Sequence, residues 1–144
     1  MTSIPDVNVL LALAFEDHEH YPQARDWYDR VIGRGEPVGL PGVVVVGFVR
    51  NATRPSSRVN TLTSLEAFAW LDGFREAMHL LSWVDHPETE SKLRELMIAS
   101  GTRGNATSDA YIAALAAAYG ATVVTFDRDF KRFDGVKLEL LPLA

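Results

Sequence analysis

The sequence predicts an α/β fold in which a mostly parallel β-sheet lies between helices. Short apolar runs that favour strands, such as residues 122–126 and 138–141, alternate with longer segments whose apolar residues recur at helical spacing. A chain of 144 residues is long enough to bury its own core without a disulfide, and it contains no cysteine. We therefore expect residues 1–144 to form a single domain.

The order of the expected elements follows from local signals along the chain. Glycine, proline and small polar residues mark where helices and strands begin or end. The apolar run at residues 4–13 is interrupted by Asp6, so we expect a strand to end there and a helix to follow directly. The expected elements are a strand before Asp6, a helix over 7–15, a helix from Pro22 to Gly33, a strand at 38–40, a helix capped by Ser64 with Ala67, Phe68, Leu71 and Phe74 on its apolar side, a strand at 80–84, a helix from about Pro87, a helix capped by Thr107 or Ser108 that runs to Tyr119, and strands at 122–126 and 138–141.

Residues 43–50 are compatible with two structures. The valines at positions 43–46 favour a strand, because β-branched side chains suit a pleated sheet. The length of the segment and its Pro41-Gly42 start also allow a buried helix. The pattern alone leaves both structures open.

Charge and hydropathy restrict the classes of function. The net charge of −5 argues against a broad phosphate-binding surface, so any nucleic-acid contact is expected to be local or helped by a cation. The N-terminus lacks a basic region, and no uncharged apolar run reaches the length of about 18 residues that a membrane helix needs. We expect a cytoplasmic protein with no signal peptide and no membrane span.

Three carboxylates occupy related places in the expected fold. Asp6 and Asp127 each follow a strand, and Asp109 opens the helix before the second of these strands. Ligands of open α/β sheets bind beyond the carboxyl ends of the strands, so the three acids meet if the first and fourth strands are neighbours. Clustered carboxylates repel one another, and a hard divalent cation such as Mg²⁺ relieves that repulsion. Such a site activates water for in-line attack at phosphorus.

Each acid also has an ordinary structural explanation. Asp109 suits the first turn of a helix, and Asp127 suits a turn or an N-cap after a strand. Asp129 suits a solvated position. Asp6 is the hardest to explain in this way, because it interrupts an apolar run. That all three acids are expected at the same end of the sheet favours a metal-binding site over three separate structural roles.

Three motifs together resemble a known family. They are Asp6-Val7-Asn8-Val9-Leu10-Leu11, then Arg103-Gly104-Asn105 followed by Ser108-Asp109-Ala110, and finally residues 120–130, which include Thr125-Phe126-Asp127-Arg128-Asp129. In order and spacing they look like a PIN-domain ribonuclease, and most closely like the VapC-type toxins of toxin–antitoxin pairs. The resemblance spans almost the whole chain.

The resemblance implies a fold, an activity and partners. The fold is a PIN-like three-layer sandwich, with a central sheet flanked by helices. The activity is that of an endoribonuclease dependent on Mg²⁺ or Mn²⁺, the toxin of a type II pair. The partners are RNA, a second copy in a homodimer, and a small antitoxin whose C-terminal segment fills the acidic groove. The implied site comprises Asp6, Asp109 and Asp127 as catalytic metal-site acids, Asp129 as a further metal ligand, and Asn8 and Thr125 as orienting residues, with capping of the first helix as the alternative for Asn8.

One position departs from the family pattern. PIN nucleases generally carry another acid, often Glu, in the helix after the second strand, and the matching position here is Gly47. The resemblance also favours helix for residues 43–50. Without that acid the site holds one metal ion rather than two, or Asp129 substitutes. The alternative function is a PIN-like module that binds RNA or an antitoxin with little or no turnover.

Several arginines are candidates for holding RNA phosphates, because each lies near an expected rim of the site. An unpartnered surface arginine is the ordinary explanation for each of them. The basic pair Lys131-Arg132 is a weaker candidate of the same kind. The arginine candidates are Arg50, Arg54, Arg58, Arg103 and Arg128.

Two other classes of protein also carry an acid directly after the first strand. A haloacid-dehalogenase-like phosphatase needs a second Asp two positions later, where this chain has Asn8. A phosphoreceiver domain needs an acidic pair at the end of the first strand, and a phosphorylatable Asp after a middle strand, and neither is evident. Both classes fit the sequence less well than a nuclease.

Overall fold

The computed structural model describes residues 1–55, 60–81 and 85–144. The strands are β1 (Ser3–Pro5), β2 (Pro37–Gly39), β3 (His79–Leu81), β4 (Thr122–Thr125) and β5 (Lys137–Leu140). The α-helices are α1 (Val7–Ala14), α2 (Tyr21–Arg34), α3 (Gly42–Thr53), α4 (Ser64–Ala77), α5 (Thr89–Ser100) and α6 (Thr107–Tyr119), and the 3₁₀ helices are η1 (Gly104–Ala106) and η2 (Arg128–Arg132).

The strands form one sheet in the order β3-β2-β1-β4-β5. Every pairing between these strands is parallel, and β1 pairs with β4 in the register Ile4↔Val123. The expected adjacency of the first and fourth strands is therefore confirmed. It places Asp6 and the residues after Thr125 at the same carboxyl edge of the sheet.

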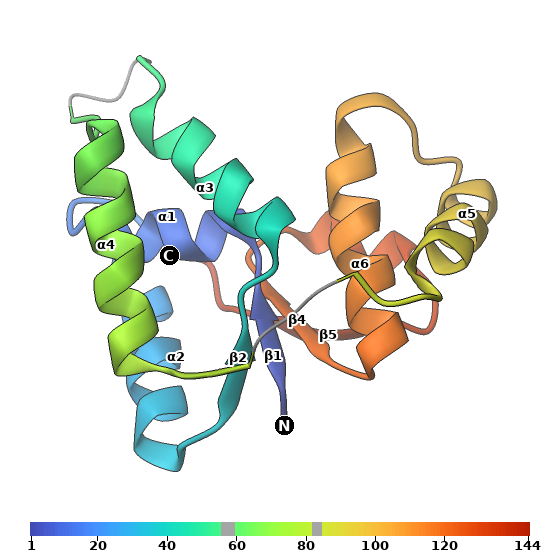
Figure 1. Ribbon diagram of the computed structural model, residues 1–144, viewed down its shortest axis with the longest axis horizontal. Coiled ribbons are helices and arrows are strands. Elements are labelled where there is room, and N and C mark those ends of the chain that lie inside the picture. Colours follow the sequence, from blue (N-terminus) through green and yellow to red (C-terminus); the bar gives the residue numbers. More distant parts are fainter. Residues whose placement is uncertain (56–59, 82–84) are drawn as a thin grey trace.

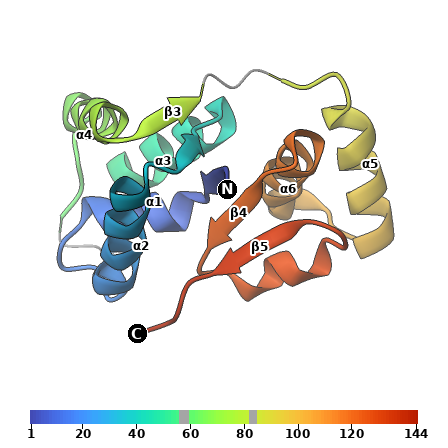
Figure 2. The ribbon, with the colours of Figure 1, turned by 90° about the horizontal axis from the view of Figure 1, so that it is seen from below.

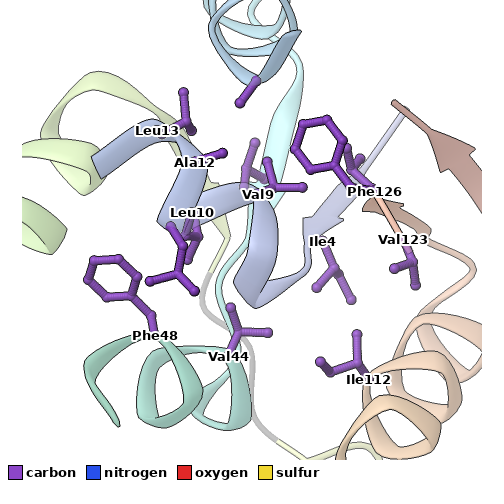
Figure 3. Packing of buried hydrophobic residues seen from close by; sticks show 14 of the residues in the cluster. Ile4, Val9, Leu10, Ala12, Leu13, Val44, Phe48, Ile112, Val123 and Phe126 are labelled. Carbon is purple, nitrogen blue, oxygen red and sulfur yellow. The ribbon is translucent and has the colours of Figure 1, made fainter. Parts of the chain in front are cut away.

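The helices lie on both sides of the strands, as the predicted α/β sandwich requires. Helices α1 to α4 are grouped at one side of the molecule and α5 and α6 at the other, with the strands between them (Figure 1 and Figure 2). The core fills the space between α1, α3, α6 and the sheet, where Ile4, Val44 and Ile112 point into a common interior (Figure 3). Burial of this surface, at about 25 cal/mol per Å², is the main force that fixes α3 and α6 against the central strands.

Residues 43–50 are helical, because they belong to α3. Val44 and Phe48 are fully buried along one face, whereas Val46 is exposed. The spacing of the buried residues follows a helix and not a strand, in which alternate residues share a face. Tertiary burial has overridden the strand propensity of the valines.

Two expected helix caps are wrong. Thr63, and not Ser64, is the N-cap of α4, and it forms a capping box with Glu66. Neither Thr107 nor Ser108 caps α6, because η1 leads into it and the N-cap position is Ala106, whose backbone is already helical. Phe68, expected on the buried face of α4, has 48% of its surface exposed.

Some expectations fall outside the described residues. These are the strand assignment for residues 82–84 and the RNA-contact candidate Arg58. Within the described part of the chain, no helix is both long and apolar enough to cross a membrane.

Candidate functional site

Asp6 occupies the junction between β1 and α1. Its backbone is extended, and its side chain caps the helix, with Oδ1 accepting a hydrogen bond from the Val7 amide at 2.7 Å. Only 4% of the residue is exposed. The direct turn from strand to helix, with no intervening loop, is what holds this carboxylate at the edge of the sheet.

Asn8 and Thr125 hold the second oxygen of Asp6. The Thr125 hydroxyl donates to Asp6 Oδ2 at 2.9 Å, and Asn8 Nδ2 donates to the same atom at 3.1 Å. Asn8 Oδ1 also accepts from the Phe126 amide at 3.3 Å. Asn8 is not the cap of α1, so that alternative is wrong. Its side chain instead links the start of α1 to the end of β4.

Asp127 is placed by the same network. Its backbone amide donates to the Thr125 hydroxyl at 2.9 Å, and its carboxylate caps η2 by accepting from the Asp129 amide at 2.9 Å. The ordinary explanation of Asp127 as an N-cap is therefore confirmed. Half-buried Asp127 keeps one carboxylate oxygen that does not take part in this cap, whereas Asp129 is exposed.

Asp109 lies in the first turn of α6, half-buried. Its Oδ2 is 3.9 Å from a guanidinium nitrogen of Arg132, which comes from the end of η2. Burial raises the pKa of Asp109, and the charges of Asp127 and Asp129 raise this pKa further, while the Arg132 charge opposes the shift. The acids of β4 and α6 therefore act on one another.

The pKa of Asp6 shows the same electrostatic coupling. Burial raises it from 3.8 to about 6, against the hydrogen bond from Thr125, and the charges of Asp109 and Asp127 add to the increase. The charges of Asp109 and Asp127 are therefore near enough to Asp6 to affect its pKa, and a shared metal site of the three acids stays a prediction. A cation between them would relieve their mutual repulsion.

A cavity of about 400 Å³ opens in front of these acids, between α3 and α6. Asp6 and Asp109 line it together with Gly47, Arg50 and Asn51 of α3. A Cβ atom at Gly47 would lie 2.6 Å from Cγ2 of Val7, so the side chain of Val7 takes the space next to this position. The α3 wall of the cavity therefore carries no carboxylate at position 47.

The other described arginines that are candidates for RNA contact differ in what their side chains bind. Arg54 donates to Asn51 Oδ1 at 2.7 Å, and Arg103 is exposed just before η1. Arg128 donates to the carbonyls of Phe126 and Leu141, at 2.9 and 2.8 Å, and so ties the C-terminal segment to the end of β4. The contact of each with RNA stays a prediction, and Arg50 is the candidate that lines the acidic cavity.

The donor set fits a hard divalent cation by its chemistry. Carboxylate oxygens are the preferred ligands of Mg²⁺ and Mn²⁺. Such a cation would favour the ionised form of Asp6, whose pKa is raised chiefly by burial and to a smaller extent by the charges of Asp109 and Asp127. Among residues 1–55, 60–81 and 85–144, no three His, Asp or Glu side chains are close enough to hold one ion together. Mg²⁺ usually keeps several waters and binds one or two carboxylates directly, so a complete protein cage is not required.

Local patterns did not identify every residue around the acids. The basic pair containing Arg132 was visible, but its approach to Asp109 depends on the packing of η2 beside α6. Asn51 had no signal beyond its place one residue after Arg50, although both line the cavity.

Comparison with known proteins places this fold and site in a family. Residues 3–136 match the model of the PIN domain, so the chain belongs to the PIN-domain family. The curated proteins to which it is similar include ribonucleases of the VapC type. Ribonuclease VapC31 of Mycobacterium tuberculosis is 34% identical over 134 residues, covering 92% of this chain and 93% of the relative. Ribonuclease VapC25 of the same species is 33% identical, with the same coverage.

Solved structures share the fold at lower identity. VapBC2 from Rickettsia felis, bound to a DNA fragment from its promoter, matches with a TM-score of 0.74 and 18% identity, over 99% of this chain and 100% of that one. DNA-bound VapBC from Salmonella typhimurium matches with a TM-score of 0.67 and 19% identity, over 96% and 97% of the two chains. The predicted three-layer α/β architecture is confirmed.

Proposed function

We propose that this protein is the endoribonuclease toxin of a type II toxin–antitoxin pair, and that it hydrolyses RNA phosphodiester bonds in the cytoplasm with Mg²⁺ or Mn²⁺. The observation that carries the proposal is the buried carboxylate of Asp6, which faces a cavity shared with Asp109. The relatives named ribonuclease, which align over nine-tenths of the chain, support the choice of RNA as substrate.

The proposed metal ligands are Asp6 and Asp109. Asp127 and Asp129 would contribute through water, since no three acids of the described residues are close enough to hold one ion together. A divalent cation held by these residues would supply Lewis-acid chemistry, polarising a phosphate oxygen and lowering the pKa of water. Asn8 and Thr125 are positioning residues, because their hydrogen bonds fix Asp6 Oδ2. Their removal would leave the carboxylate free to rotate away from the cavity.

Other side chains of the cavity would bind and activate the reactants. From the α3 wall, the Arg50 guanidinium offers hydrogen-bond donors to the phosphate. The Asn51 amide already donates one hydrogen bond from Nδ2 to the Gly47 carbonyl, at 2.8 Å, and so has one N–H left to offer. The attacking water must lose a proton, and Asp109 is better suited than Asp6 to accept it. Both oxygens of Asp6 already accept hydrogen bonds, whereas Asp109 is half-buried and opens onto the cavity.

The proposed partners follow from the matched assemblies. The structures from Rickettsia felis and Salmonella typhimurium are VapBC complexes, and a third match is FitAB bound to DNA. We infer that this chain forms a homodimer and is inhibited by a small cognate antitoxin. The acidic cavity between α3 and α6 is the expected place of inhibition, since an antitoxin segment there would exclude RNA.

A second candidate function is that of a binding module with weak or no turnover. Gly47 favours it, because the α3 wall lacks the acid that PIN nucleases generally carry there. Under this alternative the chain binds RNA or antitoxin through the same cavity but cleaves slowly or not at all.

An RNase assay on total RNA separates the two candidates. We expect the purified protein to cleave RNA in Mg²⁺ or Mn²⁺, and we expect EDTA to stop cleavage and added metal to restore it. Asp109→Asn should abolish cleavage, while Asp17→Asn, which changes an exposed acid between α1 and α2, should not. RNA binding without cleavage at any metal concentration would establish the binding module. Undiminished cleavage by folded Asp109→Asn protein would refute the assigned site.

A further inference from the structure

A second cavity, of about 460 Å³, adjoins the acidic one. Both hollows are lined by Gly42 and Val43 at the start of α3 and by Ser108 at the start of α6. They are thus consecutive parts of one groove between α3 and α6. Figure 1 shows the arrangement of these two helices. A chain whose phosphate lies at Asp6 and Asp109 would place a neighbouring nucleotide in the second cavity.

The walls of the second cavity are suited to a flat, largely apolar group. Pro41 and Val43 contribute from the α3 side, and Leu115 and the Tyr111 ring from the α6 side. Pro41 and Leu115 are buried, and Tyr111 is half-buried. Bases of single-stranded RNA bind proteins by stacking on aromatic rings and by hydrogen bonds to their Watson–Crick edges.

A carboxylate gives this cavity a hydrogen-bonding preference. Asp85 is part of the lining, and the Tyr111 hydroxyl donates a hydrogen bond to its Oδ1. That bond orients the carboxylate through Oδ1, and no hydrogen bond from another described residue reaches Oδ2, which can accept from a ligand. An ionised carboxylate only accepts, so the preferred occupant presents two adjacent donors.

We propose that this cavity is a base-recognition subsite for guanine, next to the phosphodiester bond that is cleaved. Guanine presents N1–H and N2–H side by side on its Watson–Crick edge, a pair that one carboxylate accepts together. Adenine and cytosine each place an acceptor nitrogen beside their amino group, and uracil places its single N–H between two carbonyls. Each of these would turn a lone pair toward Asp85. The inference rests on the proposed function for the position of the phosphate, and it adds the base that is read.

The test measures base preference by binding, so that it does not depend on turnover. The probes are fluorescently labelled RNA hexamers of uridine, in which one position is U, A, C or G, and the protein carries Asp6→Asn to silence cleavage. Fluorescence anisotropy in Mg²⁺ gives the dissociation constant of each hexamer. We expect the G-containing hexamer to bind about tenfold more tightly than the others.

Asp85→Asn should remove this preference, and Asp17→Asn, at an exposed acid outside both cavities, should keep it. Because loss of a negative charge strengthens RNA binding in general, the readout is the ratio between hexamers and not the affinity itself. Tyr111→Phe, which keeps the ring but removes the donor to Asp85, should reduce the ratio less than Asp85→Asn does. A circular dichroism melt of each variant checks that it is folded.

The outcomes separate the subsite from the nuclease. Equal binding of all four hexamers, or a G preference that survives in Asp85→Asn, would overturn the subsite and leave the cavity to a protein side chain such as an antitoxin arginine. A G preference that depends on Asp85, in a protein whose wild-type form cleaves none of the hexamers, would support the subsite and count against the nuclease. Cleavage by the wild type with no base preference in binding would support the nuclease and count against the subsite.

Discussion

Asp6 combines a cost to stability with the capacity to bind a cation. Its carboxylate is 4% exposed and is held by the Val7 amide, the Thr125 hydroxyl and the Asn8 amide. These donors offset only part of the cost of burial, since the pKa remains raised, to about 6. A group that is held ionised in a poorly solvated place has a strong electrostatic reason to bind a cation.

Asp6→Asn should therefore stabilise the metal-free protein. Because the pKa of Asp6 is higher in the folded protein than in the unfolded chain, the folded protein binds the extra proton between pH 3.8 and about 6. The free energy of unfolding of the wild type thus falls as the pH rises through this interval, and the variant lacks this fall. Urea unfolding in EDTA should show an advantage for the variant of about 1–3 kcal/mol above pH 6 that shrinks toward pH 4. Mn²⁺ should stabilise only the wild type, and an advantage that is the same at every pH would contradict the electrostatic explanation.

Arg132 places a positive charge beside the acids of the proposed metal site. Its guanidinium lies 3.9 Å from Asp109 Oδ2, where it opposes the increase in the pKa of Asp109. A metal ion would bind against this positive charge. Removing the charge should therefore favour the ion.

Arg132→Ala should tighten Mn²⁺ binding by about two- to fivefold, since a partly exposed pair contributes at most about 1 kcal/mol. Isothermal titration with Mn²⁺ measures this directly. Lys131→Ala is the matched control, because it removes a charge from the adjacent, exposed position. Equal effects of the two substitutions would mean that only the net charge matters.

At the scale of the elements, the contact between α1 and α3 sets the shape of the cavity wall. Val7 opens α1 and lies against Gly47 of α3, where a Cβ would approach Val7 Cγ2 to 2.6 Å. The preferred χ1 rotamer of a helical valine leaves it little freedom to move aside. Gly47 therefore allows α3 to come close to the acid-bearing end of β1.

Gly47→Ala should destabilise the protein, and the sign should reverse when Val7 is also truncated. Alanine is favoured over glycine in a helix by about 0.8–1.0 kcal/mol, but overpacking costs about 1–3 kcal/mol. In the Val7→Ala background the clash is gone, and Gly47→Ala should then stabilise by up to about 1 kcal/mol. A double-mutant cycle from urea unfolding measures the coupling. If the effects of the two substitutions on the free energy of unfolding were additive, α3 would be able to move away from Val7 without a loss of stability.

The elements also show what local sequence patterns can and cannot predict. The strand–helix turn at Asp6 and the strand before Asp127 were predictable. Both depend on the short-range spacing of apolar residues and on the glycine, proline or polar residues that mark the ends of elements. The cap at Thr63 was missed, since Thr63 and Ser64 are both good caps and only the backbone geometry distinguishes them. The local pattern left residues 43–50 open between strand and helix, because the structure of a valine-rich segment depends more on its packing than on its own propensity. The family resemblance predicted a helix there, and α3 confirms it.

At the scale of the whole molecule, the parallel order β2-β1-β4 brings the residues that follow β1 and β4 to the same carboxyl end of the sheet. The adjacency of the strands before Asp6 and Asp127 was predictable, because it follows from the sheet topology, whereas the shared function of these acids and Asp109 stays a prediction. The sequence did not predict which side chains of α3 and α6 face each other across the groove. The contacts of Asp85 with Tyr111 and of Arg132 with Asp109 join distant segments, and nothing local encodes them.

The net charge of −5 makes a prediction about RNA affinity that belongs to the molecule as a whole. Arg50 is the one arginine among the described residues that lines the acidic cavity, so we expect side chains there to neutralise only one or two phosphates. The logarithm of the binding constant should therefore fall with the logarithm of salt concentration with a slope of about −0.7 to −1.4, at about −0.7 per phosphate contact on single strands.

Anisotropy titrations of the Asp6→Asn protein in increasing KCl, at constant Mg²⁺, give the slope. Arg50→Ala should make it shallower by about 0.7, while Arg94→Ala, on exposed α5, should leave it unchanged. A slope several times steeper would mean that RNA follows a basic surface well beyond the cavity, and that the local contact at Arg50 is a minor part of binding.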